Sequence, residues 1–136
     1  MPRLVYALLA NDMLVDRESG STSFIRTVEH VLVPVLPVRL PNICLGTLWE
    51  LDGAGPFSVE VRLHAPSGKK AALGKQEVLP AEARMHRLNF RLGGIGLEEE
   101  GRYAVVLVLI QGNKALKAAE LPLYVLKAQP RPAGQA

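Results

Sequence analysis

The sequence has few of the residues that cross-link small proteins. Its 136 residues include one cysteine and three histidines, which excludes an internal disulfide framework and the common structural zinc sites. Cys44 lies within an apolar run, and we interpret it as a buried, inert thiol rather than a catalytic one. A single cysteine also fits a reducing compartment. Stability must therefore come from packing, for which 136 residues are sufficient.

The sequence also lacks a long apolar stretch. No segment approaches the ~20 apolar residues that a membrane span requires. Residues 4–10 are apolar and follow Arg3, but Asn11 and Asp12 interrupt them, and a first strand explains the segment as well as a signal peptide does. We expect no membrane association and a cytoplasmic location.

Motifs of catalysis and metal binding are also missing. The chain has no Gly-x-Ser-x-Gly elbow, no phosphate loop and no His-Glu-x-x-His motif. The best carboxylate cluster for a metal is Asp12, Asp16 and Glu18, where a solvated turn fits the spacing as well as a calcium site does. We therefore expect no catalytic residues, no metal and no cofactor, although a catalytic triad assembled by the fold is not excluded by sequence.

The charge is only slightly positive. A formal charge of +3 raises the chance of an anionic partner without establishing one. If their strands share a sheet, four outward-facing residues would form a basic patch for nucleic acid or another polyanion: Arg62, His64, Arg87 and Arg91. The alternative is a solvated face, because sheet surfaces often carry such residues to block aggregation.

Short alternating segments separated by glycine, proline, asparagine and aspartate dominate the rest of the chain. We expect strands at residues 4–10, 22–33, 43–51, 57–64, 70–78, 84–92, 101–110 and 115–125. The three prolines Pro34, Pro37 and Pro41 predict an extended crossover between sheets. Trp49 is the expected aromatic centre of the core.

The last two strands predict a hairpin with a turn at residues 111–114. At its start, Glu99, Gly101 and Tyr103 alternate in a way that resembles the tyrosine corner of immunoglobulin-like sandwiches. Val105 stands where antibody domains carry a cysteine. We therefore predict an all-β, single antiparallel β-sandwich, immunoglobulin-like, with about eight strands over residues 1–126 and a flexible tail over residues 127–136.

Further motifs run along most of the chain: residues 7–12, residues 16–20, Pro37 with Leu40-Pro41, Gly101-Arg102-Tyr103 and Leu121-Pro122-Leu123. In these turns and core positions the sequence resembles a family of small uncharacterised bacterial β-sandwich proteins. The resemblance implies the fold, and it implies no activity, cofactor or catalytic residue.

Two of the expected strands are apolar on both faces, whereas a two-layer sandwich needs one inward face per strand. Either loops cover the surplus faces or another chain does. We favour a protein interface made by these residues: Val5, Ala7, Leu9, Ala104, Val106, Val108 and Ile110. The sequence thus predicts a non-catalytic interaction module, as a homo-oligomer or an accessory subunit of a larger bacterial assembly. A polyanion binder is the alternative, and an enzyme of unknown class the third.

Overall fold

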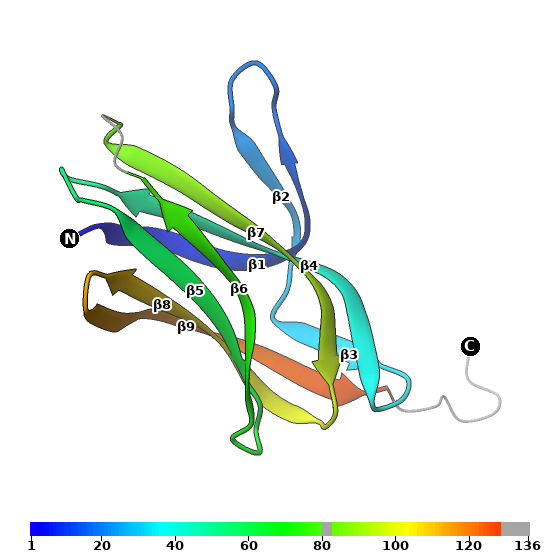
Figure 1. The fold of residues 1–136 in the computed structure, drawn as a ribbon. Coiled ribbons are helices and arrows are strands. Elements are labelled where there is room, and N and C mark those ends of the chain that lie inside the picture. The colour runs from blue at the N-terminus through cyan, green and yellow to red at the C-terminus, as the bar shows by residue number, and fades with distance from the viewer. Residues whose placement is uncertain (80–82, 129–136) are drawn as a thin grey trace, which may run out of the picture.

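The computed structural model describes residues 1–79 and 83–128, and these residues form nine strands and no helix (Figure 1). The strands are β1 (Arg3–Val15), β2 (Thr22–Thr27), β3 (His30–Val33), β4 (Val38–Glu50), β5 (Phe57–His64), β6 (Lys70–Val78), β7 (Met85–Leu97), β8 (Gly101–Gln111) and β9 (Lys114–Lys127). They make a four-stranded sheet of order β2-β1-β4-β7 and a five-stranded sheet of order β3-β9-β8-β5-β6. The all-β prediction is confirmed for the described residues. The tail expected from residue 127 falls mostly on residues 129–136, outside the described residues.

The strand count exceeds the prediction of about eight because the segment expected at residues 22–33 is two strands. Arg26 has a positive φ of 56°, which bends the chain. The Val28 N–H then donates to Leu9 O of the four-stranded sheet, whereas Glu29 O accepts from Tyr124 N–H of the five-stranded sheet. The chain therefore changes sheet between Val28 and Glu29.

One strand pair departs from the expected antiparallel arrangement. β3 runs parallel to β9, from His30 opposite Tyr124 to Val33 opposite Lys127. Every other strand pair of the described residues is antiparallel. The parallel pair arises because β3 reaches the five-stranded sheet by crossing over from β2 instead of by a hairpin.

The proline segment carries the chain between sheets, as predicted. Residues 34–37 join β3 in the five-stranded sheet to β4 in the four-stranded sheet. Pro41, expected in the crossover, lies instead within β4. It is tolerated there because β1 pairs with β4 only from Cys44 onward, so this part of β4 has a free side.

The β7 strand also continues beyond its expected end. Residues 93–97 were expected to form a loop, but they pair with residues 38–42 of β4. Ile95 and Leu97 are buried in the core, and Gly94, just before them, takes a positive φ of 66°. Burial of these two side chains explains why the ladder extends through a glycine-rich segment.

The core lies between the two sheets. Inward side chains of β4 and β7, such as Leu45 and Phe90, join those of β5 and β8, such as Val61 and Leu107, in one cluster. Trp49 is fully buried in this cluster, as predicted, and its indole Nε1 donates to Thr47 Oγ1 at 2.8 Å. The Thr47 hydroxyl donates in turn to Leu88 O at 2.6 Å. The hydroxyl of Thr47, which is completely buried, thus both donates and accepts a hydrogen bond.

The predicted tyrosine corner is present at the start of β8. The Tyr103 hydroxyl donates to Glu99 O at 2.9 Å and accepts from Glu99 N–H at 3.2 Å. The final hairpin also forms as predicted, with Gln111 paired to Lys114 across a two-residue turn.

Candidate functional site

The candidate site is the outer face of the five-stranded sheet, the side that points away from the core. Alternation along β8 places a stripe of small apolar side chains there, which we call the valine stripe: Ala104, Val106, Val108 and Ile110. These side chains form a second hydrophobic cluster, separate from the core. The surplus apolar face expected on this strand therefore exists as one continuous row.

The valine stripe is already shielded within the single chain. Val106 and Val108 are only 3 and 6% exposed. Their neighbours across the ladders are longer side chains, Glu60 and Arg62 on β5 and Lys117 and Glu120 on β9, whose stems screen the small valines from water. Folding of the single chain therefore already provides most of the free energy that was expected from burying these valines against a partner.

An exposed apolar surface continues the stripe onto β9 and β3. Pro122 lies beside Ala104, and Tyr124 and Leu126 follow on the same side of β9. In the parallel pair, His30 lies opposite Tyr124, with their rings stacked at 5.5 Å, and Leu32 opposite Leu126. Leu32, Leu126 and Tyr124 are 69, 44 and 40% exposed. We call these three residues the exposed patch.

The sequence interpretation missed the exposed patch, although a signal was present. Residues 121–126 alternate between two apolar sets, of which Leu123 and Val125 are buried in the core. The other set, which includes Tyr124 and Leu126, points away from the core. This segment is therefore apolar on both faces, the same feature that identified the interface strand at residues 101–110. The contribution of Leu32 depends on the parallel pairing of β3 with β9, which sequence does not reveal.

The three β1 residues predicted for the interface do not join this surface, because β1 belongs to the four-stranded sheet. A bulge between Leu4 and Tyr6 shifts the alternation of the strand. Consequently Leu9 lies in the core, Ala7 packs against the core, and only Val5 is exposed. The expectation that Val5, Ala7 and Leu9 share one outward face is wrong, because a bulge changes which residues point outward.

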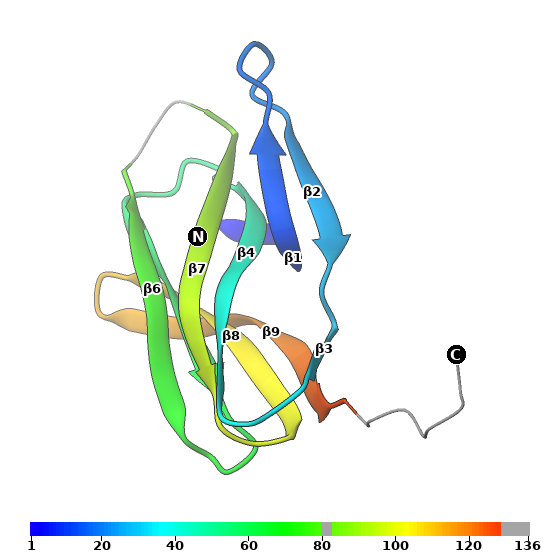
Figure 2. The same ribbon diagram turned by 90° about the vertical axis from the view of Figure 1, so that its right-hand side faces the viewer.

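The outer face of the four-stranded sheet is covered by the chain itself. The β1–β2 hairpin forms one edge of this sheet, and its tip projects beyond the other strands (Figures 1 and 2). The ring of Phe24 occupies the space where Gly46 lacks a side chain and packs edge-on to Tyr6. Ala10 and Cys44 are completely buried beneath this region, which confirms the prediction of a buried thiol.

Two of the arginines predicted for a basic patch hold this hairpin instead. Arg91 Nη1 donates to Asp12 Oδ1 at 3.1 Å and Arg91 Nη2 to Met13 O at 3.2 Å. Arg87 Nη1 donates to Gly20 O at 2.9 Å, at the hairpin's turn. The Met13 N–H and Arg91 together hold the pKa of Asp12 below its usual value. Both arginines thus have structural partners.

The other two residues of the predicted patch lie on the other sheet. Arg62 and His64 are on β5, whereas Arg87 and Arg91 are on β7, so the four do not share a sheet. Arg62 Nε donates to Glu60 Oε1 at 2.8 Å, and this contact holds the pKa of Glu60 below its usual value. The buried His64 Nε2 has no hydrogen-bond partner among the described residues. The condition for a single basic patch, strands in one sheet, is not met.

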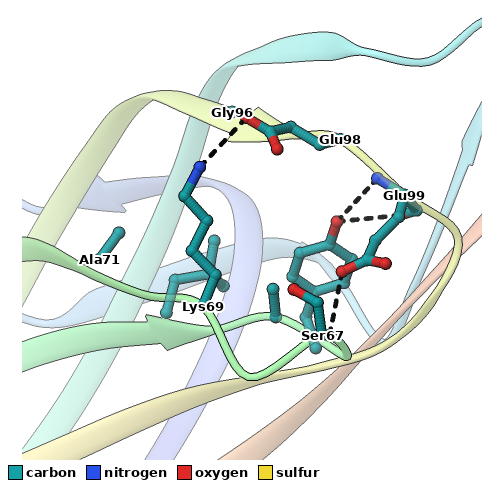
Figure 3. Close-up of a pocket in the computed structure, with 9 residues that line it drawn as sticks. Ser67, Lys69, Ala71, Gly96, Glu98 and Glu99 are labelled. Atoms are coloured by element: carbon teal, nitrogen blue, oxygen red, sulfur yellow. Dashed lines mark hydrogen bonds and ion pairs between the residues drawn. The ribbon is translucent and has the colours of Figure 1, made fainter.

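A small cavity lies at the end of the sheets, beside the tyrosine corner (Figure 3). Its volume is about 220 Å³, and its apolar wall includes Leu63 and Ala71. At its rim, Lys69 Nζ lies 3.5 Å from Glu98 Oε1, and the Ser67 backbone N–H donates to Glu99 Oε1 at 3.0 Å. Its charged groups are thus paired, and its volume is below the ~300 Å³ typical of ligand pockets.

Within residues 1–79 and 83–128, no three histidine, cysteine or acidic side chains group closely enough to hold a metal ion. Asp12 is engaged by Arg91, and Asp16 Oδ2 accepts hydrogen bonds from the backbone and hydroxyl of Ser19. This contact holds the pKa of Asp16 below its usual value. No described segment is a helix long and apolar enough to cross a bilayer.

Replacing Arg91 with alanine should loosen the hairpin without unfolding the sheets. Amide hydrogen exchange in β2 is expected to accelerate about three- to tenfold, because two arginine contacts to the hairpin are lost. Since the folded pKa of Asp12 is lowered, its contribution is present above the unfolded pKa and is lost as pH falls through the folded pKa. The wild-type hairpin should therefore loosen below about pH 4. Arg102→Ala, at an exposed arginine on the other sheet, is the control, and equal exchange in both variants would contradict the anchoring role.

Comparison with known proteins gives a family but no activity. No curated protein matches the chain. A family model described as a family of unknown function (DUF6941) matches residues 5–126, a range that spans all of the strands described above except the first two residues of β1 and the last of β9. The chain therefore belongs to the DUF6941 family, whose function is unknown.

Proposed function

We propose that this chain is an immunoglobulin-like β-sandwich that works as a non-catalytic protein-interaction module, as a homo-oligomer or as an accessory subunit of a larger bacterial assembly. The fold assignment is supported by two sheets around one core and by the corner at Tyr103. A cytoplasmic location is supported by the single, buried Cys44, which fits a reducing compartment.

The observation that carries the proposal is the exposed patch of Leu32, Tyr124 and Leu126 beside the valine stripe. Grouped apolar side chains on a regular sheet face mark interaction sites in soluble proteins. Aliphatic and aromatic side chains at the centre with charged side chains around them are also typical of the composition of protein interfaces. The outer face of the four-stranded sheet is less suited to an interface, because Phe24 and the hairpin cover it.

The exposed patch is a better target for mutation than the valine stripe. A charge placed at Val106 or Val108 would be buried in the single chain and would destabilise it. A change at Leu126 alters a side chain that is 44% exposed, so effects on folding and on binding are separable.

A photoreactive amino acid at position 126 should cross-link to a protein when the chain is expressed in cells of its natural source. The matched control is position 14, because Leu14 is 58% exposed but lies on the hairpin of the other sheet. We expect at least about fivefold more adduct from position 126, since interface contacts are specific to one face. The mass of the adduct identifies the partner as a second copy or another protein. Equal or absent adducts at the two positions would refute the proposed interface.

A further inference from the structure

The structure assigns a partner to this face: a second copy of the same chain. The five-stranded sheets of the two copies pack with their outer faces together, and a two-fold axis lies between the copies. This inference rests on the proposed function, and it adds the partner and the geometry. It derives from the charged side chains on the two sides of the valine stripe.

Four charged residues surround Val106 and Val108 in alternating sign, and we call them the charge checkerboard. At the level of Val108, the β5 neighbour is Glu60 and the β9 neighbour is Lys117. At the level of Val106 the signs are reversed, with Arg62 on β5 and Glu120 on β9. Residues paired across a ladder share one face of the sheet, so all four project outward with the valines.

This pattern is complementary to itself. If the two-fold axis runs along β8, Glu60 faces the copy's Lys117, and Arg62 faces the copy's Glu120. If the axis runs across the strands, Glu60 faces the copy's Arg62, and Lys117 faces the copy's Glu120. Either in-plane axis therefore places opposite charges against each other, and a two-fold interface requires such self-complementarity.

The remaining features of the face fit such a pair. The apolar residues of the valine stripe and the exposed patch occupy the centre and one flank, while Lys75, beside Glu60 on β6, lies toward the rim. Five strands of 4, 14, 11, 8 and 9 residues, about 4.8 Å apart and rising about 3.3 Å per residue, give a face on the order of 700 Å² per copy, or about 1,400 Å² for the pair. This total lies at the lower end of stable protein interfaces, so dissociation should be measurable at micromolar concentrations.

Charge reversal provides the test. Light scattering over a concentration range should show a wild-type dimer, and Glu120→Lys, Arg62→Glu and Lys117→Glu should each weaken it at least about tenfold, because each variant places like charges against each other. Lys114→Glu, at the β8–β9 turn, is the control that changes the net charge as much as Arg62→Glu does. Circular dichroism verifies that every variant is folded.

Mixtures of variants then test the pairing itself. An axis along β8 predicts that Glu120→Lys mixed with Arg62→Glu restores the dimer, because all four facing pairs become opposite in charge. An axis across the strands predicts restoration when Glu120→Lys is mixed with Lys117→Glu instead. Restoration by one mixture and not by the other supports the inference and identifies the axis.

Three results would overturn it: a wild-type monomer at all concentrations, single variants that dimerise like the wild type, or no restoration in either mixture. The cross-linking experiment at position 126 separates this failure from that of the proposed function. An adduct with a different protein would leave the interaction module standing and remove only the second copy as its partner. The absence of any adduct would contradict both the proposed interaction module and the second copy as its partner.

Discussion

Replacing Trp49 with alanine should lower the free energy of unfolding by about 3–5 kcal/mol, the range found for large aromatic side chains removed from protein cores. Trp49 is completely buried between the sheets and packs against Phe57 at a ring distance of 5.8 Å. Its removal leaves a cavity and deprives Thr47 Oγ1 of the indole donor. Urea denaturation followed by circular dichroism measures the change, since Trp49 is the only tryptophan and its fluorescence is lost with it.

Two further variants separate the causes of this loss. Leu116→Ala removes a large side chain that is 48% exposed and should change stability by less than about 0.5 kcal/mol. Thr47→Val keeps the volume but removes the hydroxyl that donates to Leu88 O and accepts from Trp49 Nε1, at an expected cost of about 1–3 kcal/mol for the buried indole N–H left without its partner. If Trp49→Ala cost no more than Leu116→Ala, Trp49 would not be the centre of the core.

The second large effect is expected at the tyrosine corner. Tyr103→Phe should destabilise the chain by about 1–3 kcal/mol, because the buried hydroxyl both donates to Glu99 O and accepts from Glu99 N–H. The ring stays in place, so packing is preserved. Thermal unfolding of the variant, with the ring still buried, therefore reports the hydrogen bonds alone.

Tyr124→Phe is the matched control, since Tyr124 is 40% exposed on the outer face and its ring stacks on His30. Its stability should stay within about 0.5 kcal/mol of the wild type. The Tyr103 variant should also show faster hydrogen exchange at Glu99 and Ser67, because Glu99 accepts from the Ser67 backbone N–H at the cavity rim. Equal stability of the two variants would mean that the hydrogen bonds of the tyrosine corner do not stabilise this fold.

Both sites were predictable from sequence because their patterns are local. The corner depends on residues four positions apart, and β5 and β6 begin and end where alternation and turn residues indicate. Trp49 lies in a segment whose alternate residues are all suited to a core. A period of two in a strand is set by backbone geometry alone, which is why such segments predict both the strand and its inward face.

The candidate site was only partly predictable, because it depends on which strands become neighbours. The valine stripe follows from β8 alone, but the exposed patch needs the parallel pairing of Leu32 with Leu126. The predicted set of Val5, Ala7 and Leu9 failed at a single bulge, and bulges leave no dependable trace in sequence. The predicted basic patch failed because β5 and β7 belong to different sheets.

The sequence by itself thus determined the fold class, most of the strands, the core around Trp49, the corner at Tyr103 and the surplus apolar row on β8. All of these follow from interactions between residues close in the chain or from the period of a single strand. The tertiary structure decided which surplus faces remain available: the β1–β2 hairpin covers one sheet with Phe24, whereas β9 and β3 extend the other. It also decided that Glu60, Arg62, Lys117 and Glu120 surround the same two valines, because strand order and register are set by packing of the whole chain rather than by local preference.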